Sequence, residues 1–238
     1  MKIAIIGYGK MGKEIEKIAS ERGHEIALKI TSSNTHDFTF DNLKTVDVAI
    51  EFTNPDLAVN NINVCVNSNT PIVVGTTGWY DKFAEVRESV AQNDGSLLHA
   101  TNCSIGVNLF FKLNTSLAKM MNKHKDYNVT MQETHHTQKL DAPSGTAISL
   151  AEGIVDNNED IDLWVKGDSH AHNQLSVVSH RVENVPGTHQ VNYISEIDDI
   201  EIKHTAHNRK GFAMGAVIAA EYIKDKKGIF TMEDVLFN

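Results

Sequence analysis

Residues 133–147 contain the densest group of side chains that could transfer protons. The stretch reads ETHHTQKLDAPSGTA, with His135, His136 and Lys139 just before a predicted helix. A histidine exchanges protons near pH 7, and a lysine is a protonated acid at that pH unless it is strongly desolvated. These side chains therefore predict a site that can donate protons and attract an anion.

The start of the predicted helix could bind a carboxylate group. Ser144 is a typical N-cap residue, and Pro143 restrains the chain just before it. The backbone N–H groups of Gly145 and Thr146 would point out of the helix, where they favour an anion. The formal net charge of the chain is −9, so an anionic substrate requires such a local positive pocket.

Two simpler interpretations of this stretch stay open. The adjacent histidines could bind a metal ion, but neighbouring residues on a strand point to opposite faces, and no carboxylate or cysteine shares the short spacing of known zinc sites. We therefore expect no metal. The histidines and the cap could also serve only the structure. A second group, His170, His172 and His180, lies in polar sequence and is expected to be exposed.

The first residues carry the spacing of a dinucleotide-binding loop. KIAIIGYGKMGKEI contains Gly7, Gly9 and Gly12, which is G-x-G-x-x-G after an apolar strand and before a helix. Gly7 allows a tight turn, Gly9 allows close approach of the pyrophosphate, and Gly12 allows the helix to pack on the strand. The N-terminus of the helix then faces the phosphates. A turn that merely needs glycines is the alternative.

The end of the second predicted strand bears on the choice of cofactor. NAD-selective sites usually have an acidic residue there, which binds the ribose 2′-hydroxyl. This chain has Thr31, Ser32 and Ser33 at that point, with no carboxylate before Asp37. Neutral hydroxyls do not repel a 2′-phosphate, and Lys10 lies in the glycine loop nearby. We therefore expect the site to accept both NADPH and NADH.

Three further strand ends should line the cofactor crevice, because a doubly wound sheet binds ligands at the carboxyl ends of its strands. They are residues 51–53 (EFT), 75–78 (GTTG) and 100–103 (ATNC). Residues 75–78 could approach the cofactor with backbone groups, and residues 100–103 would lie near the nicotinamide. Each segment could also be an ordinary loop.

Alternating strands and helices in the first half position these groups. We expect strands at 2–6, 25–30, 46–52, 71–75 and 96–100, and helices at 11–22, 55–67 and 80–92. This order is typical of parallel βαβ units. It predicts an α/β fold with an N-terminal Rossmann-type doubly wound parallel sheet.

The pattern changes after a helix near 106–121. Strands are expected at 129–136, 162–167, 175–181, 189–195 and 199–206, with a helix at 144–153. They predict an α+β region with a mixed open sheet. The apolar helix 211–224 and a last turn capped by Thr231 should pack back on the first region. We expect a dinucleotide-binding domain at 1–103 and 209–238, and a substrate-binding domain at 104–208.

Composition excludes several classes of protein. The 238 residues are 41% hydrophobic and 22% charged, as in an ordinary globular protein. The acidic net charge argues against nucleic-acid binding, and no apolar run reaches the roughly 20 residues that span a bilayer. The N-terminus shows no signal peptide, and Cys65 and Cys103 form no disulfide framework. We expect two free thiols, no membrane or nucleic-acid partner, and a cytoplasmic location.

The chain resembles the 4-hydroxy-tetrahydrodipicolinate reductase (dihydrodipicolinate reductase) family of lysine and diaminopimelate biosynthesis. The resemblance covers nearly the whole chain and includes GYGKMG at 7–12, EFT at 51–53, GTTG at 75–78, ATNCSIGVN at 100–108, HHTQKLDAPSGTA at 135–147 and GAVIAAEYI at 215–223. It implies an NAD(P)H-dependent enzyme that reduces a cyclic dicarboxylate, 4-hydroxy-tetrahydrodipicolinate, to tetrahydrodipicolinate with loss of water. It also implies a homotetramer built through the sheet of the second domain.

The resemblance assigns roles to individual residues. His135 would be the acid/base residue, and Lys139 would be the proton donor. The substrate carboxylates would be held by His136, Ser144, Gly145 and Thr146. The cofactor would be bound by Gly7, Tyr8, Gly9, Lys10, Met11, Gly12, Gly75, Thr76, Thr77, Ala100, Thr101, Asn102 and Cys103.

Two residues depart from the family pattern, and two other functions stay open. Many relatives have an aspartate where Glu51 stands and a phenylalanine where Cys103 stands, and the second difference leaves the packing of the nicotinamide open. A different Rossmann dehydrogenase, for homoserine or an amino acid, would not turn over the dipicolinate precursor. A non-catalytic NAD(P)H sensor is the other alternative, but a sensor needs no proton donors beside a helix N-terminus.

Overall fold

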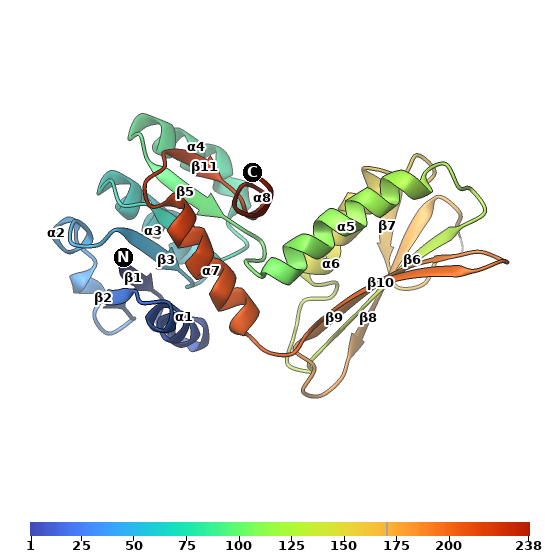
Figure 1. The fold of residues 1–238 in the computed structure, drawn as a ribbon, viewed down its shortest axis with the longest axis horizontal. Coiled ribbons are helices and arrows are strands. Elements are labelled where there is room, and N and C mark those ends of the chain that lie inside the picture. The colour runs from blue at the N-terminus through green and yellow to red at the C-terminus, as the bar shows by residue number, and fades with distance from the viewer. Residues whose placement is uncertain (170) are drawn as a thin grey trace. The chain divides into compact units, whose positions relative to one another are not determined.

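The computed structural model describes residues 1–169 and 171–238 and divides the chain into two compact units (Figure 1). Unit 1 comprises Met1–Ile105 and Arg209–Asn238, and unit 2 comprises Gly106–Asn208. His172 and His180 are exposed, as expected, whereas His170 lies outside the described residues. Among these described residues, no helical segment combines the length and the apolar composition of a membrane span.

Unit 1 is built on six parallel strands, which confirms the expected Rossmann-type sheet. The strands are β1 (Lys2–Ile6), β2 (Glu25–Ile30), β3 (Val48–Glu51), β4 (Ile72–Val74), β5 (Ser96–His99) and β11 (Gly228–Phe230). Their order in the sheet is β11-β5-β4-β3-β1-β2. Since β1 pairs with both β2 and β3, the order reverses at β1, and sheets of this kind bind ligands at such a reversal.

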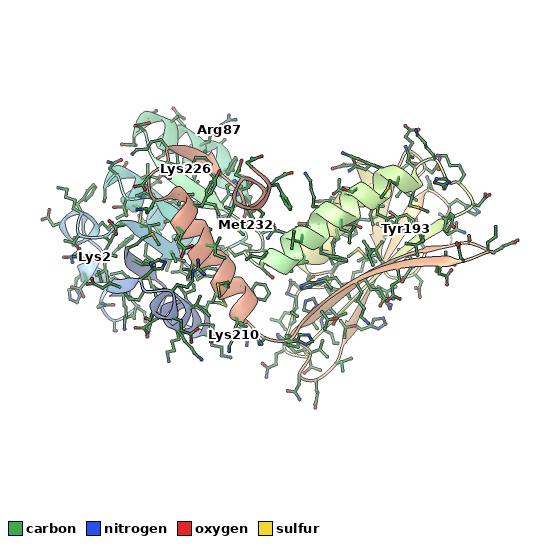
Figure 2. All side chains as sticks on the ribbon, in the orientation of Figure 1. Lys2, Arg87, Tyr193, Lys210, Lys226 and Met232 are labelled. Atoms are coloured by element: carbon green, nitrogen blue, oxygen red, sulfur yellow. The ribbon has the colours of Figure 1, made fainter. Side chains whose placement is uncertain are left out.

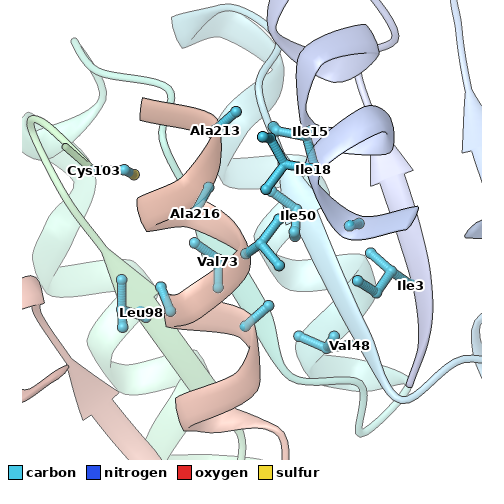
Figure 3. Close-up of a cluster of buried hydrophobic side chains, with 14 of the residues drawn as sticks. Ile3, Ile15, Ile18, Val48, Ile50, Val73, Leu98, Cys103, Ala213 and Ala216 are labelled. Atoms are coloured by element: carbon cyan, nitrogen blue, oxygen red, sulfur yellow. The ribbon is translucent and has the colours of Figure 1, made fainter. Parts of the chain in front are cut away.

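Helices cover both faces of this sheet, because alternate strand residues point to opposite sides. The helical segments are α1 (Lys10–Glu21), η1 (Thr35–Asp37), α2 (Phe40–Leu43), α3 (Pro55–Asn67), η2 (Tyr80–Lys82), α4 (Phe83–Gln92), α7 (Lys210–Ile223) and α8 (Met232–Phe237). α1, α7 and α8 share a core with Ile3, Ile5 and Ile50 (Figure 3), while α3 and α4 share one with Ala4 and Ile6. Burial on both faces explains the nearly continuous apolar sequence of the strands.

Unit 2 is a mixed five-stranded sheet with two helices on one face. Its elements are α5 (Ile105–Met121), β6 (Asn128–His135), α6 (Gly145–Val155), β7 (Leu163–Lys166), β8 (Gln174–Arg181), β9 (Gly187–Ile194) and β10 (Asp199–Ala206). The order is β10-β9-β6-β8-β7, in which β6, β8 and β7 are parallel to one another. α5 and α6 pack on the face that contains Met131, Val177 and the buried Tyr193 (Figure 2). The opposite face carries polar residues such as Gln132 and Gln190.

The end of the chain differs from the expected elements. The sequence analysis does not predict β11, which has three residues. The strand exists through its parallel pairing with β5, in which Gly228 lies opposite Ser96. α7 and α8 join unit 1, as expected, and Thr231 caps α8 through reciprocal hydrogen bonds with the Asp234 segment.

Candidate active site

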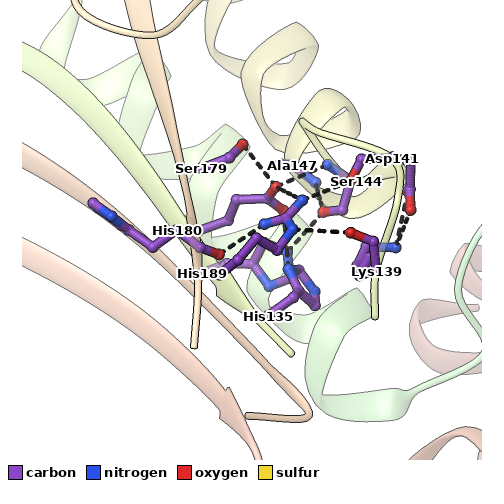
Figure 4. Close-up of polar contacts among 10 residues, drawn as sticks. His135, Lys139, Asp141, Ser144, Ala147, Ser179, His180 and His189 are labelled. Atoms are coloured by element: carbon purple, nitrogen blue, oxygen red, sulfur yellow. Dashed lines mark hydrogen bonds and ion pairs between the residues drawn. The ribbon is translucent and has the colours of Figure 1, made fainter. Parts of the chain in front are cut away.

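Glu133 and His135 lie on the same face of β6, because residues two apart on a strand point to the same side. β6 is the central strand of unit 2, and both side chains are buried: Glu133 is 1% exposed and His135 is 7% exposed. The residues opposite Glu133 on the neighbouring strands are His189 of β9 and Ser179 of β8 (Figure 4). The sheet therefore surrounds one buried carboxylate with polar side chains from both sides.

Glu133 accepts three hydrogen bonds on one carboxylate oxygen, Oε1. The donors are the backbone N–H of Ser144 at 3.0 Å, the hydroxyl of Ser179 at 2.8 Å and the guanidinium of Arg181 at 3.3 Å. The other oxygen, Oε2, lies 3.2 Å from Nδ1 of His135. Burial alone would raise the pKa of Glu133, but the contacts with His135, Ser144 and Ser179 outweigh burial and hold that pKa well below its ordinary value. Glu133 is therefore an ionised carboxylate at neutral pH.

His189 reaches the same group from β9. Its Nε2 lies 3.2 Å from the hydroxyl of Ser144 and 3.7 Å from Oε2 of Glu133, and its ring centroid is 5.1 Å from that of His135. Ser144 caps α6, as predicted, by accepting the backbone N–H of Ala147 at 3.2 Å. Burial, and then the charge of His135, lower the pKa of His189 to about 3. His189 is therefore neutral at pH 7.

The loop between β6 and α6 carries Lys139 and is bound to β8 by hydrogen bonds (Figure 4). Arg181 donates to the backbone carbonyl of Lys139 at 3.2 Å and to that of Asp141 at 2.6 Å, in addition to its bond with Glu133. The amine of Lys139 lies 2.8 Å from the carboxylate of Asp141, and 24% of the Lys139 side chain is exposed. A charged amine is thus held on an anchored loop while it stays accessible to solvent.

The other predicted substrate residues lie at the two ends of this loop. His136 directly follows β6 and is half-buried, and Gly145 begins α6 and is exposed. No described atom beyond its own helix and chain neighbours lies within 4 Å of the point where a Cβ would stand on Gly145. Thr146 follows in the first turn and is half-buried. This turn contains no acidic residue of its own, and the carboxylate of Glu133 reaches the helix start only at its N-cap, through the backbone N–H of Ser144.

Glu133, Arg181 and His189 belong to this group, although the sequence analysis assigned them no role. The spacing of Glu133 and His135 could have identified the carboxylate, since residues i and i+2 of a strand share a face. No local signal could have identified His189, which reaches the group only through the pairing of β6 with β9. Glu133, His135 and His189 bring ligand-type atoms within 4.8 Å of one another. The sequence spacing that argued against a metal ion does not register this grouping, and the absence of a metal stays a prediction.

The glycine loop of unit 1 has the conformation that its spacing predicts. Gly7 has a φ of +93°, and a Cβ there would lie 2.1 Å from the carbonyl oxygen of Phe52, so that only glycine fits. A Cβ on Gly12 would lie 2.4 Å from the carbonyl oxygen of Gly7, which explains how α1 packs so closely on the loop. At Gly9 no such neighbour lies within 4 Å among the described residues. The loop is therefore open at the position where a pyrophosphate would approach.

The side chains of the loop differ in their surroundings. Lys10, expected in the loop, is the first residue of α1 and is exposed. Met11 packs against the core of unit 1. The hydroxyl of Tyr8 donates to Glu16, whose carboxylate lies 2.6 Å from the amine of Lys29 on β2. Tyr8 is therefore tied to both α1 and β2.

A carboxylate does lie near the end of β2. Asn34 accepts from the hydroxyl of Thr31 at 2.6 Å and donates to the carboxylate of Asp37 at 3.0 Å. The hydroxyl of Thr31 also lies 2.8 Å from that of Ser33. The turn after β2 thus holds neutral hydroxyls and, through Asn34, one carboxylate, so the acceptance of both NADPH and NADH stays a prediction.

The loops after β3 and β4 are joined to each other. The backbone N–H of Thr53 donates to the hydroxyl of Thr76 at 2.8 Å, and Thr76 is buried. Gly75 is required by close packing, because a Cβ there would lie 2.1 Å from the ring of Phe52. Thr77 is exposed. Of residues 75–77, Thr77 therefore offers the most accessible groups.

Residues 100–103 lie mostly in the core of unit 1. Ala100, Asn102 and Cys103 are buried, and Thr101 is exposed. Cys103 belongs to the cluster beside α7 (Figure 3), and a Cβ on Gly215 would lie 1.7 Å from its carbonyl oxygen. Burial raises the pKa of the Cys103 thiol to about 12. The side chain of Cys103 therefore packs in the core, and the predicted nicotinamide contact of this segment stays untested.

A separate cavity of about 730 Å³ lies at the other end of β6. Its walls include Tyr127, Val129 and Tyr193. Among the described residues, its lining contains none of the predicted substrate-binding or proton-transfer side chains. The cavity is therefore distinct from the group around Glu133.

Both units match models of a single protein family. The model described as "Dihydrodipicolinate reductase, N-terminus" matches residues 1–103, and the model described as "Dihydrodipicolinate reductase, C-terminus" matches residues 106–236. The chain is 49% identical over 237 residues to the 4-hydroxy-tetrahydrodipicolinate reductase of Christiangramia forsetii, which covers 99% of this chain and 98% of the relative. It is 34% identical over 230 residues to the enzyme of that name from Rickettsia rickettsii, which covers 95% of each chain.

A solved structure has the same fold. It is described as a dipicolinate-bound dihydrodipicolinate reductase from Paenisporosarcina sp. TG-14, with a TM-score of 0.80 and 21% sequence identity. The alignment covers 97% of this chain and 97% of that one. The likeness therefore extends over both units.

Proposed function

The chain belongs to the dihydrodipicolinate reductase family, an oxidoreductase family of lysine and diaminopimelate biosynthesis, and we propose that it reduces 4-hydroxy-tetrahydrodipicolinate to tetrahydrodipicolinate with loss of water. The observation that carries this proposal is the grouping in unit 2 of a buried histidine, an anchored lysine and an accessible helix start. His135, Lys139 and Gly145 provide these three parts. A cyclic dicarboxylate needs all three, because it must be oriented and receive a proton.

The N-terminus of α6 supports a role in carboxylate binding. Gly145 is exposed, and Ser144 uses its hydroxyl within the cap rather than blocking the first turn. Backbone N–H groups at a helix start bind carboxylates well. In our proposal Gly145 and Thr146 hold one substrate carboxylate, and His136 adds a donor from the end of β6.

His135 and Lys139 supply the proton in this proposal. The substrate gains hydrogen across a ring double bond, so a proton must reach the carbon next to the one that receives the hydride. The partly exposed amine of Lys139 can donate that proton, and His135 can act as the acid/base partner. The remaining contribution of unit 2 is to orient the ring.

A nicotinamide dinucleotide fits the glycine loop of unit 1. The family is pyridine-nucleotide-dependent, and the loop has a tight turn at Gly7 and open space at Gly9. When bound, the nicotinamide supplies the hydride to ring carbon C4. We propose that the loop accepts NADPH and NADH, since the turn after β2 presents Thr31 and Ser33 to the ribose rather than an adjacent acidic residue.

We further propose a cytoplasmic homotetramer. The two cysteines of the chain, Cys65 and Cys103, are free and buried, which suits a reducing compartment. In the described part of unit 2, both helices pack on one face of the sheet, and the polar face with Gln190 and Asn192 has no helix on it. That face is the natural place for contacts between subunits.

One experiment tests the reaction directly. The purified chain is mixed with freshly generated substrate and with NADPH or NADH, and the loss of nicotinamide absorbance is followed. Consumption of either cofactor with formation of tetrahydrodipicolinate is the expected result. Turnover of homoserine or an amino acid instead would favour another dehydrogenase, and cofactor binding without any turnover would favour a sensor.

A further inference from the structure

The carboxylate of Glu133 has one oxygen saturated with donors and one directed at His135. Oε1 accepts from Ser144, Ser179 and Arg181, at 3.0, 2.8 and 3.3 Å. Oε2 lies 3.2 Å from Nδ1 of His135 as an ion pair, and among the described residues neither atom makes a hydrogen bond of ordinary geometry. Within that part of the chain, Oε2 is therefore the acceptor that lies closest at hand for a proton on Nδ1.

The neighbouring His189 lies farther from Oε2 than His135 does. Its Nε2 is 3.7 Å from Oε2 of Glu133, whereas Nδ1 of His135 is 3.2 Å away. Nε2 of His189 also shares a 3.2 Å hydrogen bond with the hydroxyl of Ser144, in which either atom can be the donor. Nδ1 of His135 is therefore the nearer donor for Oε2.

The opposite ring nitrogen of His135 faces the backbone of Gly187. A Cβ on Gly187 would lie 3.0 Å from Nε2, so the absence of a side chain there leaves room beside this nitrogen. A histidine whose Nδ1–H is fixed by a carboxylate has Nε2 available for proton exchange. The same arrangement orients the histidine in other acid/base sites.

We propose that Glu133 is a positioning residue, which fixes the proton of His135 on Nδ1 and leaves Nε2 as the nitrogen that exchanges protons with the substrate. The inference rests on the proposed acid/base role of His135. Because Oε1 of the same carboxylate bonds the N-cap of α6 and the loop-anchoring Arg181, Glu133 also holds the carboxylate-binding helix start in place relative to the histidine.

The alternative occupant of this group is a divalent cation, since Glu133, His135 and His189 place suitable atoms within 4.8 Å of one another. Two observations favour the ion pair. The charge of Glu133 already faces Arg181, and Nε2 of His189 is engaged by Ser144. A metal would have to displace the hydroxyl of Ser144 from Nε2.

The decisive measurement reads the tautomer of His135 in the unmodified enzyme. In protein labelled with nitrogen-15 in the histidine rings, proton–nitrogen correlations identify which ring nitrogen carries the proton on the alkaline side of the titration. The His135 signals are assigned by their loss in His135→Gln. We expect the proton on Nδ1, and a neutral ring protonated on Nε2 would overturn the proposal, whether or not the enzyme reduces the dipicolinate precursor.

The variant Glu133→Gln tests the consequence for turnover. Three donors hold the amide oxygen at the Oε1 position, so the amide nitrogen takes the place of Oε2 and donates to Nδ1. The proton of His135 should then move to Nε2, and kcat should fall about 100-fold, while the substrate KM and dinucleotide affinity stay within about threefold. An unchanged tautomer or an unchanged kcat would contradict the inference.

Glu152→Gln is the matched control. It makes the same chemical change at an exposed carboxylate of α6, outside the group around Glu133, so we expect the Nδ1 tautomer and a kcat within about threefold of the parent. Metal analysis of the purified enzyme completes the test. About one divalent ion per chain, with loss of activity on chelation, would assign the three residues to a metal site and reject the proposal.

Discussion

Lys139 is more exposed to solvent than His135, and this difference suits Lys139 for donating a proton to the substrate. The side chain of Lys139 is 24% exposed, whereas that of His135 is 9% exposed. Arg181 holds the carbonyls of Lys139 and Asp141, so the loop that carries the amine is anchored although its tip is accessible. An anchored and accessible amine is suited to protonate a substrate that enters from solvent.

Replacing Lys139 tests its role as the proton donor. Lys139→Ala should lower kcat by about 100-fold or more, because a general acid contributes about that factor, and it should barely change dinucleotide affinity. Steady-state kinetics and fluorescence titration with NADPH measure the two quantities. Asp141→Asn keeps the amine and is expected to retain most of the activity. If Lys139→Ala stayed within about threefold of the parent, another group would have to supply the proton.

His189 should make the stability of the protein depend on pH. Its pKa is lowered to about 3 in the folded state by burial, followed by the charge of His135, whereas the unfolded value is about 6.5. Between these values only the unfolded chain binds the proton. The contribution of His189 is therefore fully present above about pH 6.5, and it is lost as the pH falls toward about 3.

In the variant His189→Gln, the free energy of unfolding should depend less steeply on pH in the acidic range. Denaturant unfolding measured from neutral to acidic pH gives the slope of the unfolding free energy, and the parent should be steeper by up to one proton, about 1.4 kcal/mol per pH unit. His172→Gln replaces an exposed histidine and should leave the slope unchanged. Equal slopes for His189→Gln and the parent would mean that His189 is not held neutral in the fold.

The glycine loop and α1 act together as one element. Gly12 is closed in by the carbonyl of Gly7, and Gly9 has open space beside it. Gly12 thus allows α1 to pack on the loop, and Gly9 leaves space for the proposed dinucleotide. α1 also lacks a side-chain cap at Gly9, which leaves its N-terminus for a ligand.

Two alanine substitutions should separate these roles. Gly12→Ala should destabilise unit 1 by about 1–3 kcal/mol, because its Cβ would have to push against backbone. Gly9→Ala should leave the thermal unfolding midpoint nearly unchanged but weaken dinucleotide binding at least tenfold, because its Cβ occupies the approach to the pyrophosphate. Calorimetry and NADPH titration measure both. Full dinucleotide affinity in Gly9→Ala would remove the loop from the proposed cofactor site.

At the scale of the whole molecule, we expect the polar face of the sheet in unit 2 to form the contacts between subunits. In the described residues, alternate positions of β9 either join the core, as Tyr193 does, or lie half-buried on the other face, as Gln190 and Asn192 do. The polar character suits subunit contacts made through hydrogen bonds rather than a large apolar interface.

The proposed homotetramer has a direct test. Light scattering after size exclusion should give four times the chain mass of 26.3 kDa. Asn192→Lys adds a positive charge to the polar face and should reduce assembly, whereas Gln92→Lys adds the same charge at the exposed end of α4 and should not. A monomer at all concentrations would contradict the proposal.

The sequence by itself determined the elements whose signals are local. Strands β1 to β5, helices α1, α3, α4 and α7, the turn at Gly7 and the cap at Ser144 depend on periodicity or on the conformation of a few residues, and the structure confirms them. The family resemblance was equally readable, because its motifs are continuous stretches such as residues 135–147.

Only the tertiary structure decided which residues meet across strands. His189 joins Glu133 through the register of β6 and β9, and β11 exists through pairing with β5. Cys103, expected beside the nicotinamide, has its side chain in the core that α7 completes. The physical reason is the same in each case: strand pairing and burial depend on segments far away in the chain, and their partners leave no signal in the local sequence.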